Sequence, residues 1–193
     1  MSLVELIAQA DERGLAASGL ACLDRCVPLL GGDDEILRPL WASLVDGDAW
    51  GERLAKARAD LGEPDAEGPA ADAGPDASPE GAAALLARRM LAAVPAEPSA
   101  AELRTWADAC SVAALQIHRL LDASDDGTSS VAARREGRTE GMSPLVAAEL
   151  RRQVTILEVL AGHGAGGVRH ARDVSTEGRR VLRAVVSRRA RRA

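Results

Sequence analysis

Residues 99–120 read SAAELRTWADACSVAALQIHRL, and this stretch has the most regular helical pattern in the chain. Its apolar side chains recur at alternating spacings of three and four residues, which is the period of one face of an α-helix. Ser99 and Glu102 form a capping-box pattern directly before the apolar run. The stretch therefore predicts a long amphipathic helix with a seam typical of a helical bundle or coiled coil. The seam residues, which serve either helix packing or self-association, are Leu103, Trp106, Cys110, Ile117 and Leu120.

Shorter stretches on both sides of this helix show the same period. Ser78 and Ser143, each followed by proline, are good helix starts, because serine caps the first turn and proline fits the first helical position. A glycine-rich turn from Gly162 is expected to end one helix, and a last helix is expected from about Ser175. The chain contains no Phe, no Tyr and only three Trp, so its core is built from small aliphatic side chains, which suit helix packing. We expect an all-α helical bundle of about seven to eight helices.

The composition also divides the chain along its length. Residues 62–77 read GEPDAEGPAADAGPDA, with no apolar side chain larger than Ala, and such a segment cannot bury enough surface to offset the entropy of ordering it. The sequence leaves open whether the helical regions on its two sides share one core. The expected regions are an N-terminal helical region (1–61), a disordered acidic linker (62–77), a C-terminal helical bundle region (78–187) with a flexible connection at about 124–142, and an Arg-rich tail (188–193).

Charge is distributed unevenly around the net value of −5. Residues 1–80 carry 17 acidic and 6 basic side chains, whereas 81–193 carry 12 acidic and 18 basic ones. Beyond Ser187 we expect the tail to project into solvent, where basic clusters can neutralise phosphates or bind an acidic partner. The same arginines could instead reflect codon usage, or meet the acidic linker of this chain. The possible anion-binding residues are Arg179, Arg180, Arg183, Arg188, Arg189, Arg191 and Arg192.

The motifs in this sequence that could indicate catalysis or the binding of a ligand or metal are weak. Gly162–Gly167 matches the G-x-G-x-x-G spacing of a nucleotide-binding loop, but that motif acts only within a βαβ unit, which is not predicted here. Cys22 and Cys26 share a helix face without a second paired ligand motif, so core packing is the expected role. His118 is expected to be solvated or hydrogen-bonded, and the helix stripes bring no ionisable groups together inside the bundle. We therefore predict no catalytic residue, cofactor or metal.

These observations favour a non-enzymatic α-helical interaction or regulatory protein, whose partner is another protein or itself. The first alternative is a nucleic-acid-associated protein that binds phosphates through its Arg-rich C-terminal helix and tail. The second is a helical-bundle enzyme or small-molecule binder. The N-terminus lacks the basic and apolar regions of a signal peptide, no stretch is long enough for a membrane span, and three cysteines lack a disulfide framework. We expect a cytoplasmic protein without a membrane partner.

Overall fold

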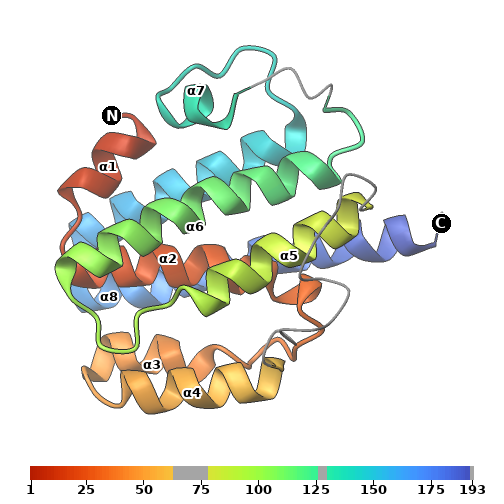
Figure 1. Cartoon of the computed structure of the whole chain (residues 1–193). Coiled ribbons are helices and arrows are strands. Elements are labelled where there is room, and N and C mark those ends of the chain that lie inside the picture. Colours follow the sequence, from red (N-terminus) through yellow and green to blue (C-terminus); the bar gives the residue numbers. More distant parts are fainter. Residues whose placement is uncertain (63–77, 126–129, 192–193) are drawn as a thin grey trace.

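The computed structural model describes residues 1–62, 78–125 and 130–191, and the described part is helical without any β-strand (Figure 1). The all-α prediction is confirmed. The expected disordered linker lies almost entirely outside the described residues. The elements are α1 (Leu3–Gln9), α2 (Glu12–Cys26), the 3₁₀ helix η1 (Val27–Leu29), α3 (Arg38–Asp46), α4 (Trp50–Leu61), α5 (Pro79–Ala92), α6 (Ala100–Leu121), α7 (Val131–Arg135) and α8 (Pro144–Ala190).

Helix α2 forms the centre of the bundle and is buried on all sides. Every residue from Gly14 to Cys26 is buried, and the helix packs mainly against α6 and α8. Its many Gly, Ala and Ser residues permit this close approach. A Cβ atom on Gly19, for example, would lie 2.6 Å from the Trp106 ring of α6. A helix enclosed in this way must also bury its polar side chains, which governs the chemistry of the core.

Helix α8 folds back on itself although its backbone is assigned as helical throughout. A straight helix of 47 residues would be about 70 Å long, yet Leu145 and Val185 line the same cavity. A Cβ atom on Gly167 would lie 2.8 Å from the carbonyl oxygen of Val159, so the glycine permits the tight reversal. In Figure 1 the paler first half runs behind α6, and the darker second half returns toward the C-terminus. The expected change of direction is present, but the expected non-helical turn and new start at Ser175 are wrong.

The helix starts follow the capping signals. At the start of α6 the Ser99 hydroxyl accepts from the Glu102 amide, and the Glu102 carboxylate accepts from the Ser99 amide. Ser78 caps α5 through its side chain, whereas Ser143 precedes Pro144 at the start of α8 without a side-chain capping bond. Buried apolar residues from both helical regions, from Leu3 to Leu182, belong to one hydrophobic core. The regions on the two sides of the acidic segment therefore share a core. No helix within the described ranges has an apolar stretch sufficient to cross a bilayer.

The connection expected to be flexible at 124–142 contains the short helix α7 in its described part. Arg135 is buried there, and its Nε donates to Ser111 Oγ of α6 at 3.1 Å. The same guanidinium forms an ion pair with Asp108. These contacts fix α7 against α6.

Candidate functional site

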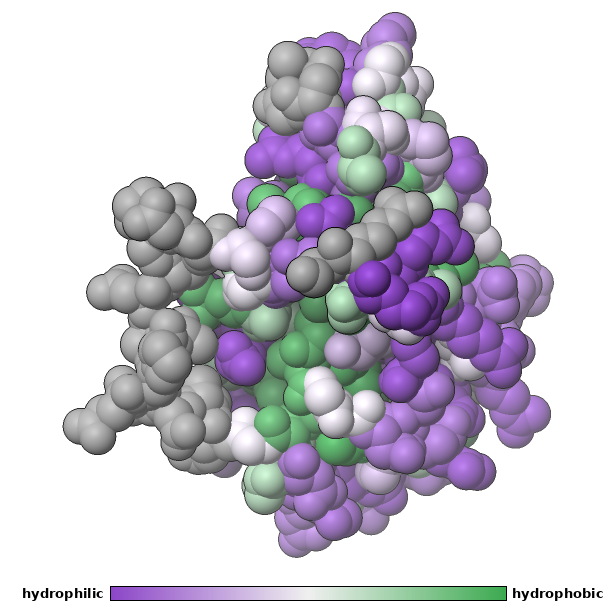
Figure 2. Space-filling model, turned by 90° about the vertical axis from the view of Figure 1, so that its right-hand side faces the viewer, coloured by the Kyte–Doolittle hydropathy of each residue, from purple (hydrophilic) through white to green (hydrophobic). Residues whose placement is uncertain are grey.

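A groove lies at the end of the bundle that carries the C-terminus. Its cavity volume is about 710 Å³, which lies within the usual range of ligand sites. It is formed where the start of α5, the end of α6 and both ends of α8 meet. Figure 2 shows this end of the molecule, with hydrophobic residues gathered in its middle and hydrophilic residues around them. The apolar lining consists of Leu121, Ala123, Pro144, Leu145, Ala148, Val181 and Val185.

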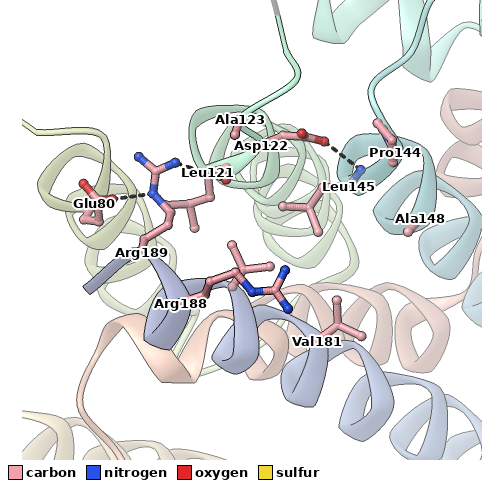
Figure 3. A pocket seen from close by; sticks show the side chains of 11 residues that line it. Glu80, Leu121, Asp122, Ala123, Pro144, Leu145, Ala148, Val181, Arg188 and Arg189 are labelled. Carbon is pink, nitrogen blue, oxygen red and sulfur yellow. Dashed lines mark hydrogen bonds and ion pairs between the residues drawn. The ribbon is translucent and has the colours of Figure 1, made fainter. Parts of the chain in front are cut away.

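Two acidic side chains line this groove, and both are engaged by the chain itself (Figure 3). Glu80 forms an ion pair with Arg189, which also donates to the carbonyl oxygen of Leu121. Asp122 accepts from the backbone amide of Leu145 at 2.8 Å and so caps the first turn of α8. The hydrogen bond from Arg189 holds the pKa of Glu80 below its ordinary value, so this carboxylate stays ionised beside its partner.

Arg188 also lines the groove, but it forms no such ion pair or hydrogen bond with a described residue. Its side chain is exposed in the last turn of α8, and no ion pair or hydrogen bond joins it to another residue of the described chain. In Figure 3 no dashed line reaches its guanidinium. Arg189 is paired with Glu80, and Asp122 keeps its negative charge at the N-terminus of α8. Arg188 is therefore the cation at the rim of the groove that has no ion-pair partner among the described residues.

The other arginines predicted to bind anions contact residues of this chain or lie outside the described residues. Arg179 is buried and its Nη1 donates to Asp24 Oδ1 at 2.5 Å, so it is paired inside the chain and is not available to an external anion. Arg183 pairs with Asp34. Arg180 lies 3.9 Å from Glu177, and Arg191 donates to the Ser187 hydroxyl, with both arginines exposed. Arg192 lies outside the described residues.

The Arg-rich tail also differs from the expectation that it projects into solvent beyond Ser187. Helix α8 continues to Ala190, which keeps Arg188 and Arg189 on a helical turn. Arg189 is half-buried because it bridges α5 and α6 through Glu80 and Leu121. These contacts make the last turn part of the groove.

The predicted seam of α6 faces the interior of the chain. Leu103, Trp106, Cys110 and Ile117 are buried, and Leu120 packs against the same core while remaining partly exposed. Helices α2, α5 and α8 cover this face of α6. The burial supports the helix-packing interpretation of the seam, because a self-association surface has to be exposed.

Ionisable groups do converge inside the bundle, contrary to the sequence expectation. Arg25 of α2 donates from Nε to Glu149 Oε2 at 2.8 Å and from Nη2 to Oε1 at 2.6 Å, with both side chains fully buried. Gln153 Nε2 donates to Glu149 Oε1 at 2.8 Å. His118 is fully buried rather than solvated, and its Nδ1 lies 2.7 Å from the Ala114 carbonyl oxygen. A carbonyl only accepts, so Nδ1 carries a proton.

Burial acts on the pKa of each member of this cluster. It would raise the pKa of Glu149, but the charge of Arg25, the neighbouring His118 and the hydrogen bonds from Arg25 and Gln153 together outweigh it, and the pKa falls to about 2. Burial lowers the pKa of His118 despite the nearby Glu149 carboxylate. The cluster therefore holds one ion pair, Arg25–Glu149, beside a neutral imidazole at neutral pH.

The buried cluster is closed to a substrate. The cavity beside it, lined by Arg25, Ser111 and Gln153 among others, measures about 10 Å³, which is close to the space that one water molecule needs. Cys22, Cys26 and Cys110 are free and buried, and burial raises the pKa of Cys22 to about 12, which suppresses the reactive thiolate. The described residues contain no group of three His, Cys, Asp or Glu placed to hold a metal ion.

Comparisons with protein-family models, with curated proteins and with solved structures found no match to this chain. The groove itself was not foreseen from the sequence, because its walls come from four chain segments far apart in sequence. The composition of the preceding residues indicates that Asp24 and Arg25 are buried. Residues 14–21 are Gly, Ala, Ser and Leu on every side of the helix, a composition typical of a helix enclosed by others.

Proposed function

We propose that the protein is a non-enzymatic interaction protein that holds an acidic, amphipathic helix of a partner protein in the groove at the end of its bundle. The observation that carries this proposal is the combination of an apolar cavity of about 710 Å³ with Arg188 at its rim. An amphipathic helix buries its apolar face in such a groove. Its acidic flank supplies the counter-charge that Arg188 lacks.

The arrangement of charges supports an anionic partner over a cationic one. Glu80 and Asp122 are the acidic residues of the lining, and each is already bound within the chain. A cationic partner would share these carboxylates with Arg189 and the Leu145 amide, and it would be repelled by Arg188. An anionic partner meets Arg188 without displacing anything, and charge complementarity of this kind selects partners and increases association rates.

The test is a fluorescence titration with a designed amphipathic helical peptide that carries Leu on one face and Glu on its flanks. A second peptide with Lys in place of every Glu is the matched probe. We expect saturable binding of the acidic peptide and at least tenfold weaker binding of the basic one. Arg188→Glu should weaken the acidic peptide by about tenfold or more, because it places like charges together.

Two further variants locate the binding. Ala148→Trp fills the groove and should abolish binding while circular dichroism still shows the helical fold. Arg180→Glu makes the same charge change on the same helix but away from the groove lining, and it should leave the affinity within about twofold. Equal binding of both peptides, or equal losses in Arg188→Glu and Arg180→Glu, would rule out the groove as the site.

Nucleic acid is the alternative partner of the basic helix. Arg179, Arg183 and Arg189 pair with carboxylates of this chain, and Arg180 lies 3.9 Å from Glu177. This leaves Arg188 and Arg191 as the exposed arginines at the described end of α8 that have no carboxylate partner. A salt titration of DNA and RNA binding, with and without residues 188–193, distinguishes a nucleic-acid partner from a protein partner. Binding that falls steeply with salt and disappears with the tail supports nucleic acid.

Three free, buried cysteines suit a reducing compartment, and we place the interaction in the cytoplasm.

A further inference from the structure

A second, smaller cavity lies where the end of α4 meets α5, away from the groove. Its volume is about 240 Å³. Leu30, Leu61 and Leu91 provide apolar walls, and Arg58 and Arg88 provide two cationic side chains. Such a mixture of apolar walls with a few polar groups is typical of sites for small molecules.

Arg58 is held in place and has an unused donor. Its Nη2 donates to the carbonyl oxygens of Ala92 and Val94, both at 2.9 Å, and to that of Leu91 at 3.3 Å, which fixes the guanidinium at the end of α5. Its Nε is buried and has no hydrogen-bond partner. The Nε is enclosed by the chain, so a ligand in the cavity meets the remainder of the guanidinium, whose positive charge has no carboxylate partner among the described residues.

Arg88 adds a second cation to the same cavity. It is half-buried on α5 and makes no ion pair with any residue that the structure describes. No carboxylate belongs to the described lining of this cavity. Two guanidinium groups thus share one partly enclosed space without a counter-charge, an arrangement that an anion would relieve.

We infer that this cavity binds a small organic anion, with a carboxylate or phosphate group beside the guanidinium groups of Arg58 and Arg88 and a short apolar body between the leucines. Arginine matches both oxyanions, because its planar fork can donate two parallel hydrogen bonds. The volume exceeds what a bare phosphate fills, which is why an apolar body belongs to the ligand. This inference is independent of the groove and of any partner protein.

The experiment follows the Arg58 Nε–H signal in ¹⁵N–¹H spectra of the full chain during titration with butyrate, butyl phosphate, inorganic phosphate and butylammonium. We expect a saturable shift with at least one butyl anion, weaker binding of inorganic phosphate, and no saturable shift with butylammonium. The better of the two butyl anions identifies the oxyanion class.

Three variants test whether the anion binds in this cavity. Arg88→Gln should weaken the butyl anion at least tenfold, and Ala92→Leu, at a residue that lines the cavity, should block binding without changing any charge. Arg13→Gln removes an equal charge at the exposed start of α2 and should leave the affinity unchanged. The inference is overturned if no anion shifts the Arg58 signal saturably, if inorganic phosphate binds as tightly as butyl phosphate, or if Arg88→Gln and Arg13→Gln bind alike.

Discussion

Arg25 of α2 and Glu149 of α8 form a bidentate ion pair in the centre of the bundle, with contacts of 2.8 and 2.6 Å and no solvent exposure of either side chain. The pair joins the N-terminal region to the C-terminal one across the acidic segment. Removing two charges from water is costly, and good geometry with further hydrogen bonds offsets that cost. We therefore expect the pair to specify how α2 and α8 meet more than it adds to stability.

Replacing one partner of this pair should be far more damaging than replacing both. Glu149→Gln leaves the Arg25 charge buried without a counter-ion, and we expect the free energy of unfolding to fall by about 3 kcal/mol or more. The double variant Arg25→Met/Glu149→Met should recover most of that loss. Urea denaturation of the three proteins measures the effect. A single variant within about 1 kcal/mol of the wild type would mean that the charge is not enclosed.

His118 should give the protein a stability that declines in mild acid. Burial lowers its pKa below the ordinary value of 6.5, so the folded state favours the neutral ring. The resulting stabilisation is fully present above pH 6.5 and is lost as the pH falls below it, by at most about 1.4 kcal/mol per pH unit. We expect His118→Leu to flatten the decline between pH 7 and 5. Denaturation at several pH values compares the two slopes, and parallel slopes would contradict a neutral, buried ring.

Gly178 should not tolerate a side chain. An added Cβ atom would lie 2.9 Å from Arg152 Cδ and still closer to Arg25 Cδ. Gly178→Ala therefore crowds the buried ion pair, and we expect a loss of about 1–3 kcal/mol. Gly162→Ala is the matched control on the same helix, because nothing lies within 4 Å of its Cβ position. That variant should be neutral or slightly stabilising. Similar thermal midpoints for the two variants would contradict the close approach.

The arginines of the C-terminal helix should differ sharply in their effect on folding. Arg179→Met leaves Asp24 buried without its partner, and we expect a loss of about 3 kcal/mol. Arg188→Met removes an exposed side chain without an ion pair in the described chain, and its effect should stay within about 0.5 kcal/mol. Chemical denaturation of both variants provides the comparison. Equal effects would mean that Arg179 is as exposed as Arg188.

The helices were predictable from sequence because their signals are local. Ser99 with Glu102 and the Ser78–Pro79 pair act within one turn, and the structure begins α6 and α5 at the next residue in each case. The burial of Arg25 in an ion pair was not predictable from such local signals. A polar residue on a short helix is usually solvated, and only the enclosure of α2 by α6 and α8 converts it into a buried ion.

The groove could not be predicted because it depends on how distant segments meet. Leu121 ends one helix, and Leu145 and Val185 lie near opposite ends of another. Their spacing in sequence predicts which face of each helix is apolar, but not which ends of the helices lie together. The charge of Arg188 was visible in the sequence. Its lack of a partner became visible only once Arg189 was seen to take Glu80.

The groove exists because α8 folds back on itself, so the most direct measurement is a distance between its two halves. Spin labels at Arg151 and Arg180, which are both exposed, report it by double electron–electron resonance. The folded-back helix predicts a narrow distribution at a distance clearly shorter than a straight helix would give. A straight helix would separate these positions by about 44 Å, and a distribution centred there would contradict both the groove and the function assigned to it.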